Sequence, residues 1–289
     1  MAETLNAFTV DLEDWYQGLE IESSMWQQFE SRIETGIKTL LSILDEYQVK
    51  ATFFVLGHLA ERYPELIKKI AGLGHDIGSH GYSHTMLYKL TPTQFRDELK
   101  RSKGMLEGLC GKKVTCFRAP FFSITRDSLW ALDILSEEGF SFDSSIFPVH
   151  NYRYGIPEAP RSPFTLTLEN RRTIREFPIS VHRLAGVNLP FSGGAYFRLL
   201  PYRLTHYCIK RVNGLGLPVV FYIHPWELDP HHPRINLPRR ISLTHYARLS
   251  STKKKLEKLL KHFKFTSLTG ALEQFGKGKV IFSKDFLRI

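Results

Sequence analysis

Two histidines four residues apart, His80 and His84, have a spacing that suits metal ligation. They lie in residues 74–84, where Gly81 between them favours a loop over a helix. Neutral imidazoles are common ligands of zinc and of neighbouring transition metals, and two of them leave room for a carboxylate and a water molecule. A metal site here would need further groups from elsewhere in the chain.

Other stretches offer those groups, each directly after an apolar run that is typical of a β-strand. Carboxylates follow the first run at Asp11, Glu13 and Asp14, a cation follows another at Arg118, and a third histidine, His224, ends a third run. A metal-dependent hydrolase needs one group to take a proton from water and another to protonate the leaving group. Asp11 suits the first task and His224 the second. Arg118 would pair with Asp11 and favour its ionised form.

The same residues also have ordinary structural interpretations. The acids of residues 11–14 could form a solvated turn, His224 could be a buried histidine, and Arg118 could form a structural salt bridge. Aromatic side chains near these positions would suit the faces of sugar rings, although each could equally belong to the core. They are Trp15, Tyr16, Phe121, Phe122, Tyr196, Phe197 and Trp226.

Strands and helices that alternate along the chain must position these residues. Expected strands cover 6–10, 51–57, 75–79, 114–118, 140–143, 175–180, 218–223 and 265–268. Expected helices cover 26–47, 64–73, 91–109, 125–138, 201–213 and 251–263. Residues 147–173, rich in proline and without a clear period, predict a long ordered loop.

This alternation indicates an α/β fold with a parallel sheet. Every candidate residue falls at the C-terminal end of a strand, where both (β/α) barrels and open α/β sheets build their sites. We predict a distorted (β/α) barrel with seven strands, because residues from six or more strands must converge. The chain is predicted to be one domain, 1–289, with its core motifs in 6–230. Residues 231–289 are predicted to form a basic C-terminal extension that packs on the barrel.

Composition limits the class of protein. The chain has 289 residues, 43% of them hydrophobic, and no apolar run that approaches the ~20 residues of a membrane span. Its N-terminus shows no signal-peptide pattern. Three cysteines, Cys110, Cys116 and Cys208, fit no disulfide framework or metal knuckle. A reducing cytoplasm is therefore the expected location.

The net charge of +10 is concentrated at one end. Residues 233–289 hold 14 Lys and Arg against 3 Asp and Glu. No recognition motif accompanies this charge, so nucleic acid is not an expected partner. The helix expected at 251–263 has a lysine face and an apolar stripe. It should pack inward with solvated lysines, and contact with an anionic membrane surface at the inner face is a second hypothesis.

Six motifs in order make this sequence resemble the polysaccharide deacetylases of carbohydrate esterase family 4. The resemblance is to the branch of peptidoglycan deacetylase-like and exosortase (PEP-CTERM)-associated exopolysaccharide deacetylases. The motifs lie at residues 9–15, 51–57, 74–84, 117–120, 142–145 and 224–227. Residues 193–198 and the basic tail are also similar to the exosortase-associated branch.

The resemblance implies a metal-dependent hydrolase that removes N-acetyl groups from the amino sugars of an exopolysaccharide or peptidoglycan-like glycan. It implies one divalent transition metal, zinc before cobalt, nickel or manganese. Asp11 takes the place of the base, His80 and His84 of the metal histidines, Arg118 of the arginine that orients the base, and His224 of the acid. The implied substrate-binding positions are Trp15, Pro120, Phe121 and Trp226. A backbone N–H just after Pro120 would help to hold the oxyanion.

The first motif departs from the family pattern. Most of the family has two adjacent aspartates there, the base and then a metal ligand, whereas Asp11 is followed by Leu12. The third ligand must therefore be Glu13 or Asp14. Relatives with the ligand two residues after the base favour Glu13.

Two rival functions remain open at this point. An allantoinase-like amidohydrolase acting on a small cyclic amide would have a closed pocket at the metal, whereas a glycan needs an open groove. A catalytically inactive glycan-binding relative would hold no metal. The intact set of candidate residues argues against the inactive relative.

Overall fold

Seven parallel strands form the centre of the computed structural model, which describes residues 4–169, 171–275 and 281–288. Their order is β10 (Val220–Ile223), β1 (Asn6–Leu12), β2 (Thr52–Val55), β3 (Asp76–Ser79), β4 (Cys116–Phe117), β5 (Phe142–Asp143) and β7 (Thr173–Glu176). Each strand pairs in parallel with the next. The predicted α/β fold is confirmed, with this run as its parallel core.

Three more strands extend the sheet. β6 (Phe164–Thr167) is antiparallel to β7, and β12 (Ile281–Ser283) is parallel to β6. β11 (Phe265–Thr266) pairs with the start of β1. Residues 231–289, expected to pack on the barrel, thus also contribute β11 and β12 to the sheet. That residues 1–289 form one domain stays a prediction.

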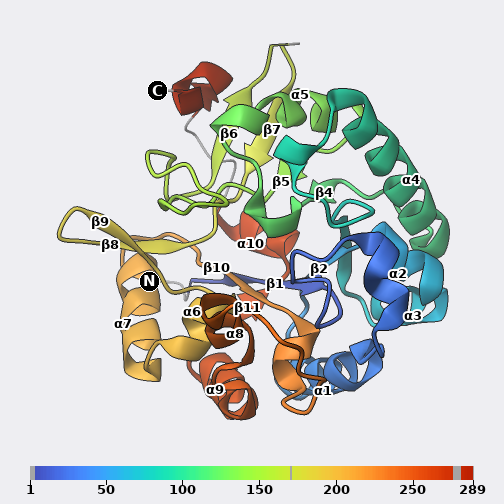
Figure 1. Ribbon diagram of the computed structural model, residues 1–289. Helices are drawn as coiled ribbons and strands as arrows, with labels where there is room; N and C mark the ends of the chain where they lie inside the picture. Colours follow the sequence, from blue (N-terminus) through green and yellow to red (C-terminus); the bar gives the residue numbers. More distant parts are fainter. Residues whose placement is uncertain (1–3, 170, 276–280, 289) are drawn as a thin grey trace.

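The two ends of the seven-strand run are connected through a loop segment. The Val220 N–H donates to Ser180 Oγ at 2.8 Å, and the Tyr222 N–H donates to the Ser192 carbonyl at 2.9 Å. Between these points the hairpin of β8 (Val181–Leu184) and β9 (Val187–Pro190) projects from the body (Figure 1). No ladder among the described residues joins β7 to β10, so the barrel is distorted and interrupted here.

Helices cover the outside of the sheet (Figure 1). Those of the first half are α1 (Ile33–Glu46), α2 (Gly57–Arg62), α3 (Pro64–Gly72), α4 (Pro92–Cys110) and α5 (Trp130–Glu137). Those of the second half are α6 (Gly194–Leu199), α7 (Tyr202–Asn213), α8 (Arg239–Tyr246), α9 (Leu249–His262) and α10 (Leu268–Phe275). No helix of the described ranges is long and apolar enough to cross a membrane.

Local sequence explains the ends of α4, the longest of these helices. Thr91 caps it by accepting the Gln94 N–H, and the Gln94 side chain bonds back to the Thr91 N–H. The helix ends at Gly111, whose φ of 65° lies in the left-handed region that favours glycine. A capping box and an αL glycine are local signals, so this helix could be predicted from sequence almost to the residue.

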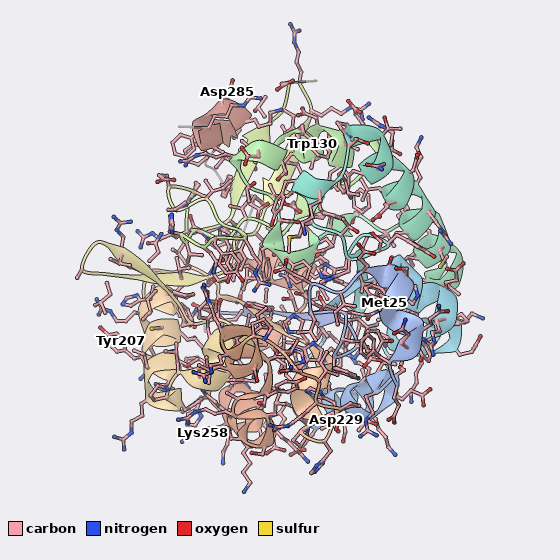
Figure 2. All side chains as sticks on the ribbon, viewed as in Figure 1. Met25, Trp130, Tyr207, Asp229, Lys258 and Asp285 are labelled. Carbon is pink, nitrogen blue, oxygen red and sulfur yellow. The ribbon has the colours of Figure 1, made fainter. Side chains whose placement is uncertain are left out.

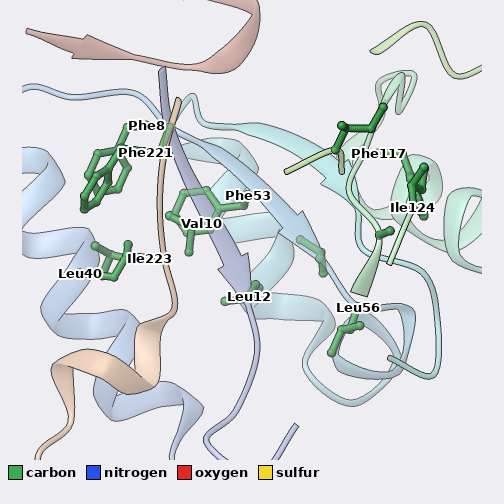
Figure 3. Packing of buried hydrophobic residues seen from close by; sticks show 14 of the residues in the cluster. Phe8, Val10, Leu12, Leu40, Phe53, Leu56, Phe117, Ile124, Phe221 and Ile223 are labelled. Atoms are coloured by element: carbon green, nitrogen blue, oxygen red, sulfur yellow. The ribbon is translucent and has the colours of Figure 1, made fainter. Parts of the chain in front are cut away.

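The core holds β1 rigidly at the centre of the sheet. Figure 3 shows Val10 and Leu12 of β1 beside Phe53 of β2 and Ile223 of β10, and all four side chains are fully buried. Burying one such side chain contributes roughly 1.5–3 kcal/mol. Because side chains alternate along a strand, Asp11 points to the face opposite that of Val10 and Leu12. The core therefore fixes the backbone that carries the first candidate residue.

Two sequence expectations were wrong in detail. The loop predicted for 147–173 contains β6. The helix predicted for 26–47 is a short 3₁₀ segment, Ser23–Gln28, followed by α1. Strand pairing and contacts with distant segments decide the structure of these residues, and local periodicity does not reveal them.

Candidate active site

A cavity of about 310 Å³ opens at the C-terminal ends of the central strands. Its lining brings together most of the residues that the sequence singled out, namely Asp11, Glu13, His80, His84, Phe121, Phe122, Tyr196, His224 and Trp226. They come from the ends of β1, β3, β4 and β10 and from α6. The convergence of distant strand ends on one cavity is the arrangement expected of an α/β active site.

Glu13 lies at the centre of a buried cluster with the two histidines. Its Oε1 is 3.0 Å from His80 Nε2 and 2.9 Å from His84 Nε2. All three residues are at most 5% exposed. The second oxygen, Oε2, is buried and accepts no hydrogen bond from the described residues.

The protonation of this cluster fits a cation. His80 Nδ1–H donates to the Arg118 carbonyl at 2.7 Å, which leaves Nε2 with a lone pair directed at Glu13. Burial lowers the pKa of His84, so its imidazole is neutral. Burial alone would raise the pKa of Glu13, but the nearby His84 and His224 and the close contacts of its carboxylate with the His80 and His84 imidazoles hold it well below its usual range. Two imidazole nitrogens and an ionised carboxylate oxygen converging on one point suit a divalent transition metal.

The chain between the two histidines is bent to bring them together. Gly81 has a φ of 75°, and His84 itself has a φ of 58°. A non-glycine residue in this region costs about 1–2 kcal/mol. Such a cost persists where the surrounding structure imposes it, and it is common at binding sites.

Asp14, the other candidate ligand, points away from the cluster. Its two carboxylate oxygens accept the Arg32 N–H at 3.0 and 3.1 Å, and one of them accepts the Ser31 hydroxyl at 2.5 Å. Arg32 immediately precedes α1, so Asp14 supplies the negative charge at the start of that helix. The geometry therefore favours Glu13 over Asp14.

Two of the four predicted substrate-binding residues do not line the cavity. Trp15 is 1% exposed, stacks on His232, and donates its indole N–H to the Glu30 carbonyl at 3.0 Å. Pro120 is buried at the start of the turn that follows β4. That these two residues bind substrate stays a prediction, and in this structure both support the site from behind its wall. Phe121 and Trp226 do line the cavity.

Asp11 and Arg118 form a fully buried ion pair. Arg118 Nη1 donates to Asp11 Oδ1 at 2.7 Å and to Thr9 Oγ1 at 2.8 Å. The rest of the guanidinium donates to the carbonyl and hydroxyl of Ser144 at 3.0 and 2.8 Å. These bonds fix one oxygen of Asp11 and leave Oδ2 facing His224, whose Nε2 is 3.9 Å away.

His224 is held by a second carboxylate–arginine pair. Its Nδ1–H donates to Glu227 Oε1 at 2.8 Å, and the same oxygen accepts the His224 backbone N–H at 3.0 Å. Arg198 donates its Nε–H to Glu227 Oε2 at 2.5 Å. Its remaining N–H groups donate to backbone carbonyls of residues 244–247. The imidazole therefore presents Nε2 to the cavity in a fixed orientation.

Sequence reasoning assigned no role to Glu227 or Arg198. An acid three residues after a histidine, with a proline between, is a capping spacing that could have pointed to Glu227. Arg198 carries no such local signal, because its partners lie 29 and more residues further along the chain.

The charges around His224 change its titration. Burial alone would lower the pKa of His224, but the carboxylates of Glu13, Glu227 and Asp11 raise it to about 9. Burial would raise the pKa of Glu227, but Arg198 and the bond from His224 lower it to about 2. His224 is thus a cation at neutral pH, next to an ionised Glu227.

Aromatic rings build the walls beside these groups. Phe121 packs its ring 4.4 Å from that of His84. Trp226 stacks between His224 and His245, with ring centroids 5.3 and 4.4 Å apart. Apolar faces beside a few fixed polar groups are typical of small-molecule and sugar sites.

Two family models match consecutive parts of the chain. Residues 20–138 match the model described as Polysaccharide deacetylase. Residues 144–273 match a second model, described as a domain of unknown function, DUF3473. His80, His84 and Arg118 lie in the first match, and Arg198 and the motif at 224–227 lie in the second.

Curated proteins and solved structures are similar to this chain. A peptidoglycan-N-acetylglucosamine deacetylase of Bacillus cereus is 33% identical over 117 residues, which are 36% of this chain and 42% of that protein. A peptidoglycan deacetylase of Helicobacter pylori is 35% identical over 118 residues, 41% of this chain and 39% of that protein. The chain thus matches about two fifths of the length of each.

A crystal structure assigned as a polysaccharide deacetylase from Mycobacterium smegmatis superposes with a TM-score of 0.60 at 19% identity. That superposition covers 95% of this chain and 92% of the other. At this identity the likeness shows the fold, and the chemistry has to be argued from the site itself.

Proposed function

We propose that this chain, whose residues 20–138 match the model described as Polysaccharide deacetylase, is a metal-dependent hydrolase that removes N-acetyl groups from the amino sugars of a glycan polymer. One observation carries this proposal. Asp11 and His224 face one another in the cavity, directly beside the cluster of Glu13, His80 and His84. Base, acid and metal ligands are what hydrolysis of an acetamide requires.

Glu13, His80 and His84 would hold the metal, and a cation bound there would acidify a water molecule and polarise the amide carbonyl. We propose zinc first, because two imidazoles and a carboxylate with open positions suit it. Cobalt, nickel and manganese accept similar ligands.

In this proposal Asp11 takes the proton of the attacking water. Arg118 binds Oδ1 of Asp11, stabilises its charge and leaves Oδ2 free to accept. The carbonyl oxygen becomes an oxyanion as the water attacks. It would accept a hydrogen bond from the backbone N–H of Phe121, just after Pro120. Phe121 has a φ of 54°, an unusual conformation imposed by this turn.

His224 then protonates the amine as it leaves with the sugar. Its proton is on Nε2, since Nδ1–H is committed to Glu227. The raised pKa keeps that proton in place at neutral pH until the amine needs it. Trp226, stacked on the imidazole, shields it from water on one side.

A second hollow supports a polymer over a small cyclic amide. It has a volume of about 430 Å³ and shares residues 151–154 with the wall of the main cavity. The two hollows thus border the same strip, and we propose that a glycan chain passes over it from one to the other. Several sugars of an exopolysaccharide or peptidoglycan-like chain would fit along such a path.

The test is acetate release by the purified chain after zinc, cobalt or nickel is added. N-acetylchitotetraose and peptidoglycan glycan strands are the glycan substrates, and allantoin represents the small cyclic amide. We expect acetate from a glycan, loss of the activity with a chelator, and no turnover of allantoin. Turnover of allantoin alone would support the amidohydrolase, and metal content near zero with no acetate would support an inactive glycan-binding protein.

A further inference from the structure

The strip of residues 151–154 at the mouth of the cavity carries an exposed aromatic ring. Tyr152 is 60% exposed and lines both the main cavity and the second hollow. A sugar that extends from the main cavity toward the second hollow would contact this ring. The groups around Tyr152 would then face that neighbouring sugar.

Two guanidinium groups lie over Tyr152 from different parts of the chain. Arg153 comes from the strip itself, 5.1 Å from the ring centroid, and Arg240 comes from the first turn of α8, 4.6 Å from it. Stacking on an aromatic face holds a guanidinium in place while its N–H groups stay free in the plane. This is the arrangement in which arginine recognises a carboxylate through two parallel hydrogen bonds.

The charges at the mouth do not cancel. Arg153 donates to Glu20 at 3.1 Å, so these two are paired. Arg198, deeper in the cavity, is neutralised by Glu227. Arg240 is exposed and forms no ion pair within the parts of the chain that the structure describes. One positive charge at the entrance thus has no protein partner.

The carboxylates of the floor do not supply that partner either. Asp11 is bound by Arg118, and Glu13 is bound by the two histidines of the cluster. A cation that is stacked, oriented and unpaired is suited to an anionic sugar, whereas a neutral sugar would leave its charge without a partner.

We propose that the cavity selects an N-acetylated glycan in which the sugar next to the reacting one carries a carboxylate, as a uronic acid does, and that Arg240 binds this carboxylate. This inference rests on the proposed function and names its substrate class. Tyr152 orients Arg240 by stacking, and Arg153 borders the subsite.

The experiment compares wild type with three variants of matched design. Arg240→Gln removes the charge, Arg240→Lys keeps the charge without the planar fork, and Arg239→Gln removes the neighbouring exposed charge, which does not line the cavity. Substrates are a tetrasaccharide of alternating glucuronic acid and N-acetylglucosamine, N-acetylchitotetraose as the neutral reference, and glycan strands containing N-acetylmuramic acid. The last of these carries the carboxylate on an amino sugar.

We expect wild type to have a higher kcat/KM on the glucuronic acid oligosaccharide than on N-acetylchitotetraose. This preference should fall as salt is added, because salt screens the charges. Arg240→Gln should lower the ratio of acidic to neutral kcat/KM by about tenfold, mainly through KM, as one lost charge-assisted hydrogen bond would. Arg240→Lys should recover part of the ratio, and Arg239→Gln should leave it within about twofold, because a surface charge outside the contact acts weakly.

An unchanged ratio in Arg240→Gln, or an equal fall in Arg239→Gln, overturns the proposal. A preference for the muramic acid strands alone overturns the assignment of a uronic acid, since the carboxylate would then be the lactyl group of an amino sugar. Calorimetric titration of both tetrasaccharides separates this question from catalysis. If the acidic one binds more tightly through Arg240 but no acetate is released, the subsite stands and the proposed function fails; equal binding of both by wild type removes the subsite.

Discussion

The cavity contains two buried carboxylate–arginine pairs that prepare their partners for opposite tasks. In the first, Arg118 binds Asp11 itself, so the group that faces the cavity is a carboxylate whose second oxygen can accept a proton. In the second, Arg198 binds Glu227, and Glu227 binds His224. The charge of Glu227 therefore acts on the imidazole of His224. The group that faces the cavity is then a cation that can donate a proton. The same kind of ion pair prepares a base where its carboxylate faces the cavity directly. It prepares an acid where an imidazole lies between the carboxylate and the cavity.

The two pairs also differ in what holds the arginine. Arg118 is anchored by side-chain hydroxyls and a carbonyl on β1 and after β5, within the parallel core. Arg198 is anchored by three carbonyls at residues 244–247, around the end of α8. The base therefore depends on strand register, and the acid depends on the docking of a helix from the basic C-terminal end.

The largest expected effect comes from removing the metal site beside which both pairs act. His80→Ala and Glu13→Ala should lose the bound metal and with it all measurable acetate release, since each removes a ligand. Elemental analysis after dialysis against zinc measures the metal.

Asp14→Ala is the matched control for Glu13→Ala. It should keep the metal and lose about 1 kcal/mol of stability through the lost charge at the start of α1, measured by urea unfolding. Full metal occupancy in Glu13→Ala together with an empty Asp14→Ala would reverse the ligand assignment.

The next effect separates the base from the acid. Asp11→Asn and His224→Ala should each keep the metal and lower kcat by ~10²–10⁴-fold, the usual contribution of a general base or acid. Steady-state acetate release gives kcat, and thermal unfolding followed by circular dichroism shows whether each variant is folded. A folded variant with near-normal turnover would show that its residue has another role.

A smaller effect tests whether Glu227 tunes His224. His224 must be protonated to act, so with a pKa of about 9 the rate should fall as the pH rises through 9. Glu227→Gln removes a charge that raises this pKa. The alkaline limb of the kcat profile should therefore move to lower pH, and kcat at pH 8 should fall by up to about tenfold, as a shift of about two units would give.

Asp229→Asn is the control for this shift. Asp229 is also a buried carboxylate paired with an arginine, Arg32 at 2.8 Å, but it does not line the cavity (labelled in Figure 2). Its replacement changes the net charge equally and should leave the alkaline limb in place. If both variants shift the limb alike, the effect comes from general charge and Glu227 has no special coupling to His224.

The smallest expected effect concerns α9, which packs beside the acid side of the cavity. Leu256, Leu259 and Leu260 are buried, as the apolar stripe predicted. Of its five lysines, Lys255 turns inward to the carbonyls of Phe197 and Leu200.

The four exposed lysines are Lys253, Lys254, Lys258 and Lys261, and Figure 2 shows Lys258 at the periphery. We propose that they draw the enzyme to the anionic inner face of the cytoplasmic membrane, with up to ~1 kcal/mol from each. Replacing all four by glutamine should reduce co-sedimentation with anionic vesicles at low salt and leave kcat unchanged. Equal binding to neutral vesicles, or binding that survives the replacement, would leave only the packing role.

The sequence by itself determined the positions of the chemical groups along the fold. Asp11, Arg118 and His224 each end an apolar run, His80 follows a short strand, and parallel strands place such ends at one edge. That edge could be inferred without coordinates because strand periodicity and helix caps are local. The resemblance of six ordered motifs to a known family then indicated the chemical roles of these residues.

Only the tertiary structure decided which neighbours these groups have. Glu13 and Asp14 are adjacent acids, and their fates diverge because the start of α1 binds Asp14 from 18 residues away. Arg198 reaches Glu227 across 29 residues, and no spacing rule announces that contact. Trp15 is drawn into the core for the same reason. Contacts between segments distant in sequence depend on packing of the whole chain, which local patterns do not encode.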